Sequence, residues 1–319
     1  MIIGSVTLTQ LSAFVLTARL GSVKDAATAL NVSEPAVSQA LAALRQHLGD
    51  QLITRNGNGM TLTPAGARLL PVASQMVALG AEAQAAVRVA QGLPTQLRLV
   101  TDSVIAEFIA APLADAFAGR FGHQVETSSG VAASAEMPVL IGNRLADVAL
   151  GPSLAARGFG LVSEPVFRYK LVAVASPRAK LRGSARGWPW LVDPSGIDPG
   201  SDTSALLRRL GVPEPQVRVF PNQTAAWAAA ADGDGVAPGV AHLVSHQVRR
   251  GQLRVVETHA TPMEATWHAT TLSRDCRPGV AGSLRRFLGT PEAMQLMREP
   301  RGGVPPSRFR PPVYVTIWS

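Results

Sequence analysis

Cysteine and long hydrophobic runs are what this 319-residue sequence has least of. The single cysteine, Cys276, excludes a disulfide within the chain. No uninterrupted apolar stretch reaches the roughly 18 to 20 residues that a membrane span requires. The N-terminus carries no charged segment followed by the apolar core of a signal peptide. We therefore expect a reducing, cytoplasmic setting and no membrane partner.

The sequence motifs of common enzyme active sites are also missing. There is no Gly-x-Ser-x-Gly elbow, no His-Glu-x-x-His and no phosphate-binding loop. The glycine-rich segment 233–239 does not have the spacing of a dinucleotide site, and a proline stands where the helix would begin. His242 and His246 could share a helix face as metal ligands, but no carboxylate or thiol accompanies them. We expect no enzymatic activity, no cofactor and no metal.

Composition bounds the number of domains and the type of partner. With 319 residues and 46% hydrophobic content, the chain can fill more than one core, so we expect at least two domains. The formal net charge of +8 favours polyanionic partners. Residues 1–91, however, hold six Lys or Arg against four Asp or Glu. Charge alone therefore does not indicate which part of the chain would bind nucleic acid.

Residues 20–48 have the pattern of two helices around a tight turn. Ser22 is placed to cap the first helix, whose apolar side chains recur at the i, i+3, i+4, i+7 spacing at Val23, Ala26, Ala27 and Leu30. Residues 31–32 make the turn. Ser33 can accept a hydrogen bond from a free N–H group of the second helix, and Pro35 suits its first turn, where no N–H is needed.

The second helix has an apolar inner face and a polar outer face. The inner face is predicted to consist of Val37, Ala40, Leu41, Leu44 and Leu48. Ser38, Gln39, Ala42 and Arg45 then point outward, as in a recognition helix in the major groove. Gln39 could read adenine, and Arg45 guanine or a phosphate. A helical hairpin in a protein that does not bind DNA shows the same stripes and caps, so this motif alone leaves both interpretations open.

Residues 7–66 as a whole resemble the DNA-binding domain of the LysR-type transcriptional regulators. The shared segments fall in the family's order and spacing and are Thr9 to Phe14, Gly21 and Ser22, Ala26 and Ala27, Leu30, Val32 and Ser33, Pro35 to Ser38, Leu44, Leu48 and Gly49, Leu52 to Arg55, and Leu62 to Gly66. The resemblance implies a winged helix-turn-helix whose DNA contacts come from Ser33, Pro35, Ser38, Gln39, Arg45, Arg55 and Asn56.

The wing and two departures from the family qualify this expectation. Arg55 and the tip at 56–59 would lie against the DNA backbone and minor groove, although a hairpin turn also needs glycine simply for its positive φ. Glu34 stands where the family commonly has Gln, and residues 42–43 are alanines where basic residues are frequent. A carboxylate at a helix N-terminus suits the helix dipole but repels phosphate. These departures affect operator sequence and affinity.

A long helix is predicted from Thr63 and Pro64 to about Gln91, with a length of roughly 40 Å. Apolar residues alternate at steps of three and four, as in a coiled-coil seam, at Leu69, Val72, Met76, Leu79, Ala83, Ala86 and Ala90. The alternative is a helix docked on its own domain, and Pro71 should kink it. The family uses this helix to dimerise, which implies a homodimer or homotetramer.

From residue 96 onward, short apolar runs alternate with helical stretches, which indicates βαβ units and a mostly parallel sheet. A helix is expected over 105–117, and a second set of elements begins near Val166. This part resembles the family's effector domain, an α/β fold of two lobes built like a periplasmic binding protein. The implied domain spans 95–298, with lobe I at about 95–163 and 266–298 and lobe II at about 164–265.

The predicted helix starts beyond the sheet's strands carry candidate effector ligands. They are Thr101, Asp102, Ser103, Ser129, Ser201, Thr203 and Thr224. Each would also serve as an ordinary helix cap in any α/β protein. A carboxylate at Asp102 disfavours a simple anion unless an arginine such as Arg168 compensates. We therefore expect a cationic or hydrogen-bond-donating effector.

After Arg298 the resemblance ends. Residues 299–319 form a Pro-rich extension in which 311–318 has the composition of one strand, with a disordered tail as the alternative. The sequence thus predicts a DNA-binding domain at 7–66, a linker helix at 67–91 and an effector domain. The expected function is a transcriptional regulator that binds double-stranded DNA and a small-molecule effector, with RNA polymerase as a further candidate partner. A ligand-independent architectural DNA binder is the rival.

Overall fold

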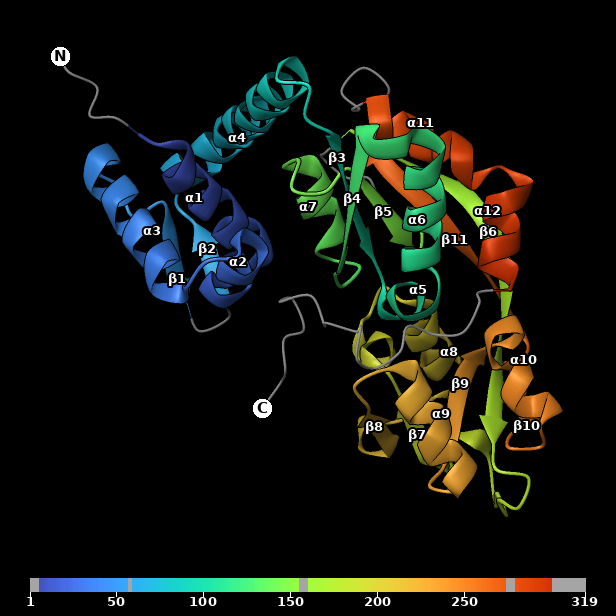
Figure 1. The fold of residues 1–319 in the computed structure, drawn as a ribbon. Coiled ribbons are helices and arrows are strands. Elements are labelled where there is room, and N and C mark those ends of the chain that lie inside the picture. Colours follow the sequence, from blue (N-terminus) through green and yellow to red (C-terminus); the bar gives the residue numbers. More distant parts are fainter. Residues whose placement is uncertain (1–5, 57–58, 155–159, 274–278, 300–319) are drawn as a thin grey trace.

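The computed structural model describes residues 6–56, 59–154, 160–273 and 279–299. A helical domain at the N-terminus is connected by one long helix to a two-lobed α/β domain (Figure 1). The lone cysteine and residues 300–319 of the Pro-rich extension, with its predicted strand, lie outside the described residues. Within the described ranges, every helix is too short or too polar to cross a membrane.

The N-terminal domain is built from capped helices and a small hairpin. α1 (Leu8–Leu20) begins at a capping box in which Thr7 and Gln10 bond each other's backbone. α2 (Val23–Leu30) ends at Asn31, whose φ of 54° lies in the left-handed region, and α3 (Glu34–Leu48) follows at once. β1 (Ile53–Asn56) and β2 (Gly59–Leu62) pair antiparallel as the wing. The core includes Leu11, Phe14, Ala26, Val37 and Leu44.

α4 (Pro64–Ala90) is the connecting helix, and its ends confirm the sequence prediction. The Thr63 hydroxyl accepts a hydrogen bond from the Gly66 N–H at 3.0 Å, and Gln91 caps the C-terminus. The helix is continuous through Pro71. Ala73 and Val77 are buried on the side that contacts α1, whereas the opposite side carries exposed apolar residues.

The α/β domain is organised around one sheet that runs through both lobes. Its strand order is β4-β3-β5-β11-β6-β9-β7-β8, with β10 paired to β6. β6 (Leu161–Ala175) and β11 (Met263–Leu272) are the long antiparallel strands that cross between the lobes (Figure 1). The other strands are β3 (Thr95–Thr101), β4 (Val125–Val131), β5 (Val148–Gly151), β7 (Trp190–Val192), β8 (Val217–Val219), β9 (Val236–Val240) and β10 (Arg254–Val256).

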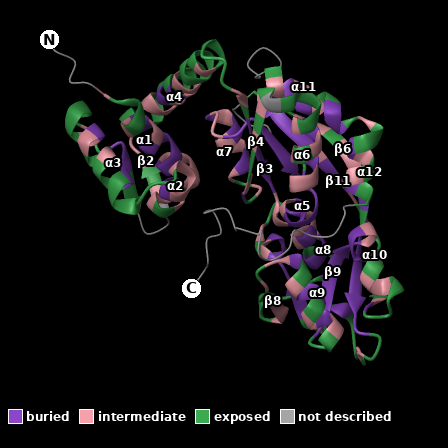
Figure 2. Cartoon of the chain, viewed as in Figure 1, coloured by how far each residue is buried: buried purple, intermediate pink, exposed green. Residues whose placement is uncertain are grey.

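Helices cover both lobes, and the strands between them are mostly buried (Figure 2). Lobe I carries α5 (Ser103–Phe108), α6 (Ala110–Phe121), α7 (Met137–Gly142), α11 (Gly279–Leu288) and α12 (Pro291–Arg298). Lobe II carries α8 (Asp202–Leu210), α9 (Gln223–Asp232) and α10 (Ala241–Arg249). The short 3-10 helices are η1 (Gly122–Gln124), η2 (Ala185–Gly187), η3 (Pro194–Ile197) and η4 (Glu214–Gln216).

Three local predictions were wrong. The single helix expected over 105–117 is two helices that meet at Ile109, because Pro112 has no N–H and would clash with the carbonyl four residues earlier. β9 was not predicted, since a proline and a glycine inside it weaken the strand signal. Leu48, expected on the inner face of its helix, is 44% exposed.

Candidate DNA-binding surface and effector site

The outer face of α3 presents polar side chains above a buried apolar face. Ser33 caps the helix by accepting a hydrogen bond from the Ala36 N–H at 3.4 Å, and Pro35 occupies the first turn. Ser33, Pro35, Ser38 and Gln39 are all exposed, whereas Val37, Leu41 and Leu44 on the other face are buried. The predicted division of this helix into two faces is therefore present, and contact with DNA by the four exposed residues stays a prediction.

Arg45 is placed differently from the free, outward-pointing side chain that the sequence predicts. Its Nε donates to the carbonyl of Gln51 at 2.8 Å, and its Nη2 donates to the carbonyl of Ile53 at 3.1 Å. The guanidinium thus holds the chain where it enters the wing. The fork-shaped group satisfies two backbone acceptors that helical periodicity alone does not reveal.

The wing is fixed by contacts that the sequence reading missed. The Asp50 carboxylate accepts the Leu52 N–H at 2.6 Å and the Thr63 hydroxyl at 2.7 Å, and these bonds lower the pKa of Asp50. A Cβ at Gly66 would overlap the carbonyl oxygen of Leu52, which is why α4 needs glycine there. Arg55 is exposed on β1.

Asn56 is the last residue of β1 and is paired with Gly59, so it lies where the sequence predicts the start of the wing's tip. The centre of that tip, residues 57–58, lies outside the described residues. Contact of Arg55 and Asn56 with DNA stays a prediction.

In the α/β domain, candidate effector residues from both lobes are connected through Asp193 and Ser195. The Ser103 hydroxyl of lobe I donates to the Asp193 carboxylate of lobe II. Ser195 donates to Asp193 at 2.6 Å, and its oxygen lies 3.1 Å from that of Thr203. Ser201 donates to the Ser195 carbonyl and caps α8. These residues form one hydrogen-bonded network across the lobes.

Glu107 is the most consequential residue that sequence reasoning missed. Its carboxylate is 6% exposed and accepts the Gln223 N–H at 2.9 Å and the Thr224 N–H at 3.1 Å, together with the Thr224 hydroxyl. Lobe I thus inserts a carboxylate into the N-terminus of α9, where unpaired N–H groups favour an anion. A charged residue between Ile105 and Phe108 was the available sequence signal.

Two predicted effector residues, Thr101 and Ser129, lie apart from the contacts between the lobes. Thr101 is fully buried, and its hydroxyl donates to the Asp102 carbonyl at 3.1 Å. Ser129 is exposed on β4, which is an edge strand of the sheet. The structure therefore does not bring these two residues together with the candidates between the lobes, and a role for them in effector binding stays a prediction.

The region around Asp102 is strongly acidic. Asp102 caps α5 by accepting the Ile105 N–H at 2.8 Å. Burial, together with the nearby carboxylates of Asp193, Asp202 and Asp198, raises the pKa of Asp102 to about 7. Arg168 is exposed on β6, and the charges that shift the pKa of Asp102 are all negative. The structure therefore does not support compensation by Arg168.

His242, which the sequence suggests as a possible metal ligand, packs against aromatic rings. His242 lies edge-on to Phe167 and Trp267, with ring centroids 5.3 and 6.0 Å away, and burial lowers its pKa. In the part of the chain that the structure describes, His, Cys, Asp and Glu side chains form no group of three that could hold a metal ion.

Comparison with known proteins identifies the family. Residues 8–67 match the family described as "Bacterial regulatory helix-turn-helix protein, lysR family", and residues 90–290 match "LysR substrate binding domain". An uncharacterized HTH-type transcriptional regulator of Mycobacterium tuberculosis is 31% identical over 97% of this chain and 99% of its own length. The regulator CfxR of Cupriavidus necator is 29% identical over 95% of this chain and 97% of its own.

Solved structures share the fold. A full-length AphB variant superposes with a TM-score of 0.57 at 16% identity, covering 88% of this chain and 97% of AphB. The LysR family regulator CbnR gives a TM-score of 0.52 at 19% identity, with 88% and 98% of the two chains covered. The chain therefore belongs to the LysR-type transcriptional regulators, with a helix-turn-helix DNA-binding domain followed by an effector-binding domain.

Proposed function

We propose that the chain reads its operator with the outer face of α3 and positions itself on the DNA backbone with the wing. The observation that carries this is the exposed pair Ser38 and Gln39, held above a buried apolar face by the cap at Ser33. Side chains on this face can reach base edges in the major groove, and Arg55 on the wing can neutralise a phosphate. We place this activity in the cytoplasm, with RNA polymerase as a candidate partner at the promoter.

We further propose that two chains pair along α4. Val72, Met76 and Leu79 are 53%, 44% and 63% exposed, and they lie outside the buried face that Ala73 and Val77 form. An exposed apolar stripe of this kind suits a partner helix. The pair would present two recognition helices to two half-sites, either as a homodimer or as half of a homotetramer.

The effector is proposed to be a small molecule with cationic or hydrogen-bond-donating groups that binds between the lobes. Asp102, Asp193 and Asp202 concentrate carboxylates there, and Glu107 already occupies the helix end where an anionic ligand would be favoured. Such a ligand would replace contacts such as that between Ser103 and Asp193, and so shift the population between lobe arrangements.

Salt titrations on operator and scrambled duplexes test the DNA-reading role. Ser38→Ala and Gln39→Ala should lose preference for the operator, because base contacts specify sequence. Arg55→Ala should weaken both duplexes alike and reduce the salt dependence, because a phosphate contact carries no sequence information. A loss for Gln39→Ala that is equal on both duplexes contradicts the assignment of α3.

The effector class is tested on the full chain by thermal shift with matched amines and carboxylic acids. Wild type should respond to amines, whereas Asp102→Ser should improve the response to acids by removing a like charge. An unchanged response for both classes would make Asp102 only a helix cap. If no small molecule shifts the protein or its DNA binding, the architectural DNA binder is favoured.

A further inference from the structure

The DNA-binding domain packs directly on lobe I of its own chain through α7 and the segments around it (Figure 1). Val139 of α7 is 6% exposed and is part of the hydrophobic core of the N-terminal domain. Leu145 packs against the same core, and Arg144 forms an ion pair with Glu82 of α4. An effector-domain helix is therefore a structural part of the DNA-binding domain.

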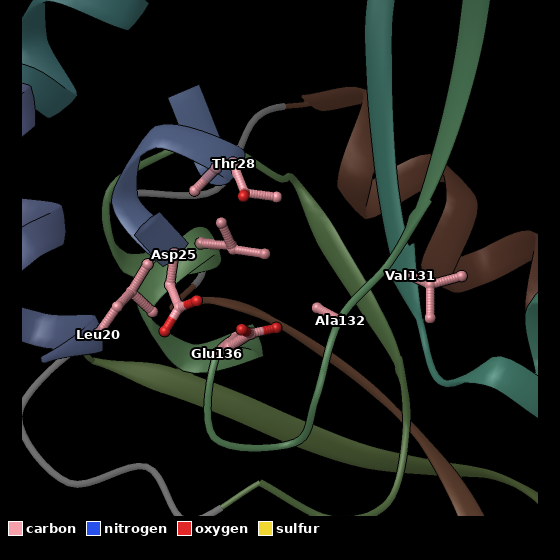
Figure 3. A pocket seen from close by; sticks show the side chains of 8 residues that line it. Leu20, Asp25, Thr28, Val131, Ala132 and Glu136 are labelled. Atoms are coloured by element: carbon pink, nitrogen blue, oxygen red, sulfur yellow. The ribbon is translucent and has the colours of Figure 1, made fainter. Parts of the chain in front are cut away.

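A small cavity between α2 and the segment 131–140 marks this interface (Figure 3). Its volume of about 20 Å³ holds about one water molecule, so it is a packing gap and not a ligand site. Asp25 of α2 and Glu136 of the segment before α7 line it side by side (Figure 3). Burial raises the pKa of Glu136, and Asp25 and Asp198 raise it further.

A tight turn connects the gap to α7. The Glu136 carboxylate accepts the Ala133 N–H at 2.9 Å, and the Glu136 N–H donates to the Ala133 carbonyl at 3.0 Å. The next residue, Met137, is fully buried at the start of α7. Because the turn is closed by two bonds and anchored at its end, a force applied at residues 133–136 moves α7 with it.

The same turn is held by lobe II. The Ser134 N–H donates to Asp198 Oδ2 at 2.8 Å, and its hydroxyl donates to Asp198 Oδ1 at 2.6 Å. Asp198 directly follows η3, the segment that contains Ser195 of the inter-lobe network. A Cβ at Gly200 would overlap the Ser134 side chain, so the backbone of lobe II lies directly against the turn.

We propose that residues 132–145 form a coupling element that reports the position of lobe II to the helix-turn-helix. Ser134 follows lobe II through Asp198, and Val139 passes the displacement to the helices that support α3. Both ends are packed or hydrogen-bonded contacts within one chain, as a physical coupling path requires. The inference rests on the proposed function only in that an effector is what moves lobe II.

Hydrogen exchange on the full-length protein, without DNA or effector, tests the coupling. Ser134→Ala removes the hydroxyl bond to Asp198 and should speed exchange about fivefold both in α7 and in α2, which the substitution does not touch. Gly200→Ala leaves Ser134 in the chain but forces it away, and should have the same effect. Ser283→Ala, which removes a hydroxyl that bonds Gly279 and Arg286 of its own helix, is the matched control and should change neither helix.

The coupling must also depend on Val139. In a Val139→Ala background, Ser134→Ala should still speed exchange in the 133–136 turn but no longer in α2, a non-additivity expected of residues that act in series. If Ser134→Ala and Gly200→Ala speed hydrogen exchange in the turn but leave exchange in α2 unchanged, the proposal is overturned. That outcome is separate from failure of the DNA-reading role, which is measured by operator preference in Gln39→Ala.

Discussion

The two ends of this regulator present their candidate binding residues in opposite ways. Ser38 and Gln39 are exposed on the single helix α3, and its cap, Ser33, bonds a backbone N–H only three residues away. Between the lobes, Ser103 bonds a residue 90 positions away, and Glu107 bonds one 117 positions away. The proposed DNA-reading surface is therefore accessible as it stands, whereas the proposed effector site is occupied by the protein's own groups.

This difference assigns the two regions different physical tasks. A rigid exposed surface gains affinity from contacts that are already arranged, so little ordering is needed when DNA binds. A site closed by internal hydrogen bonds binds a ligand only by exchanging those bonds, and that exchange changes the relation between the lobes. In the proposed function, the DNA-reading surface is therefore preorganised, and effector binding changes the hydrogen bonds between the lobes.

The largest expected effect is on pairing along α4. Replacing Met76 and Leu79 together by Glu places like charges in the proposed seam and should dissociate the pair. Operator affinity should fall about 100-fold or more, because one half-site gives far less binding energy than two. Sedimentation and footprinting measure both quantities.

The control for this substitution is Gln84→Glu with Ala85→Glu, which adds the same charge at exposed positions of α4 away from the stripe. It should leave the mass and the footprint intact. An unchanged mass for the Met76 and Leu79 variant would mean that the exposed stripe does not hold the chains together.

The next largest effect is expected at Glu107. Glu107→Ala leaves the N–H groups of Gln223 and Thr224 without their acceptor and should lower the free energy of unfolding of the α/β domain by about 3 kcal/mol. All five tryptophans follow residue 187, so tryptophan fluorescence in urea reports on this domain. Glu292→Ala, which breaks an exposed ion pair with Arg120, should cost about 1 kcal/mol or less. Equal losses of stability for the two variants would contradict the conclusion that Glu107 holds the lobes together.

Stability of the same domain should fall with rising pH. Asp102 has a folded-state pKa of about 7, above its ordinary 3.8, so the folded protein holds a proton that the unfolded chain releases. The penalty is absent below about pH 4, grows as pH rises toward 7 and is complete above it.

Asp102→Asn keeps a helix-capping oxygen but cannot titrate, so it should remove about 2 to 3 kcal/mol of the decline between pH 5 and pH 8. Urea unfolding of both proteins across this range measures it. Parallel stability profiles would show that Asp102 is ionised at ordinary pH. Glu107, Asp193 and Asp202 also have a raised pKa, because of burial, so the variant should retain part of the slope.

The sequence could predict contacts between residues that are close together in the chain, but not contacts between distant ones. The caps at Ser22, Ser33 and Thr63 are confirmed, because each bond spans three residues and depends only on local geometry. The cap at Ser201 was equally predictable, but its bond to the Ser195 carbonyl was not.

Glu107 and Asp193 were missed because the partners they have in the other lobe become their neighbours only in the folded domain. The need for glycine at position 66 likewise arises from contact with the Leu52 carbonyl. Long-range packing, and not local pattern, fixes these residues.

The smallest effect is expected at Arg45 of α3, whose side chain, like those between the lobes, is hydrogen-bonded to the protein itself. Arg45 bonds the carbonyls of Gln51 and Ile53, so Arg45→Ala should destabilise the wing by about 1 kcal/mol. Exchange at residues 51–55 should quicken, and binding to operator and scrambled duplexes should weaken to the same degree.

Arg45→Lys separates the two possible roles of this side chain. Lysine keeps the charge but lacks the planar fork that reaches two carbonyls at once, so it should not restore protection of the wing. If Arg45 instead reads guanine, both variants would lose operator preference while exchange in the wing stays as in the wild type. That result would assign Arg45 to the outer face of α3 together with Ser38 and Gln39. The contrast with the residues between the lobes, which are bonded to one another, would then hold for every predicted DNA contact on α3.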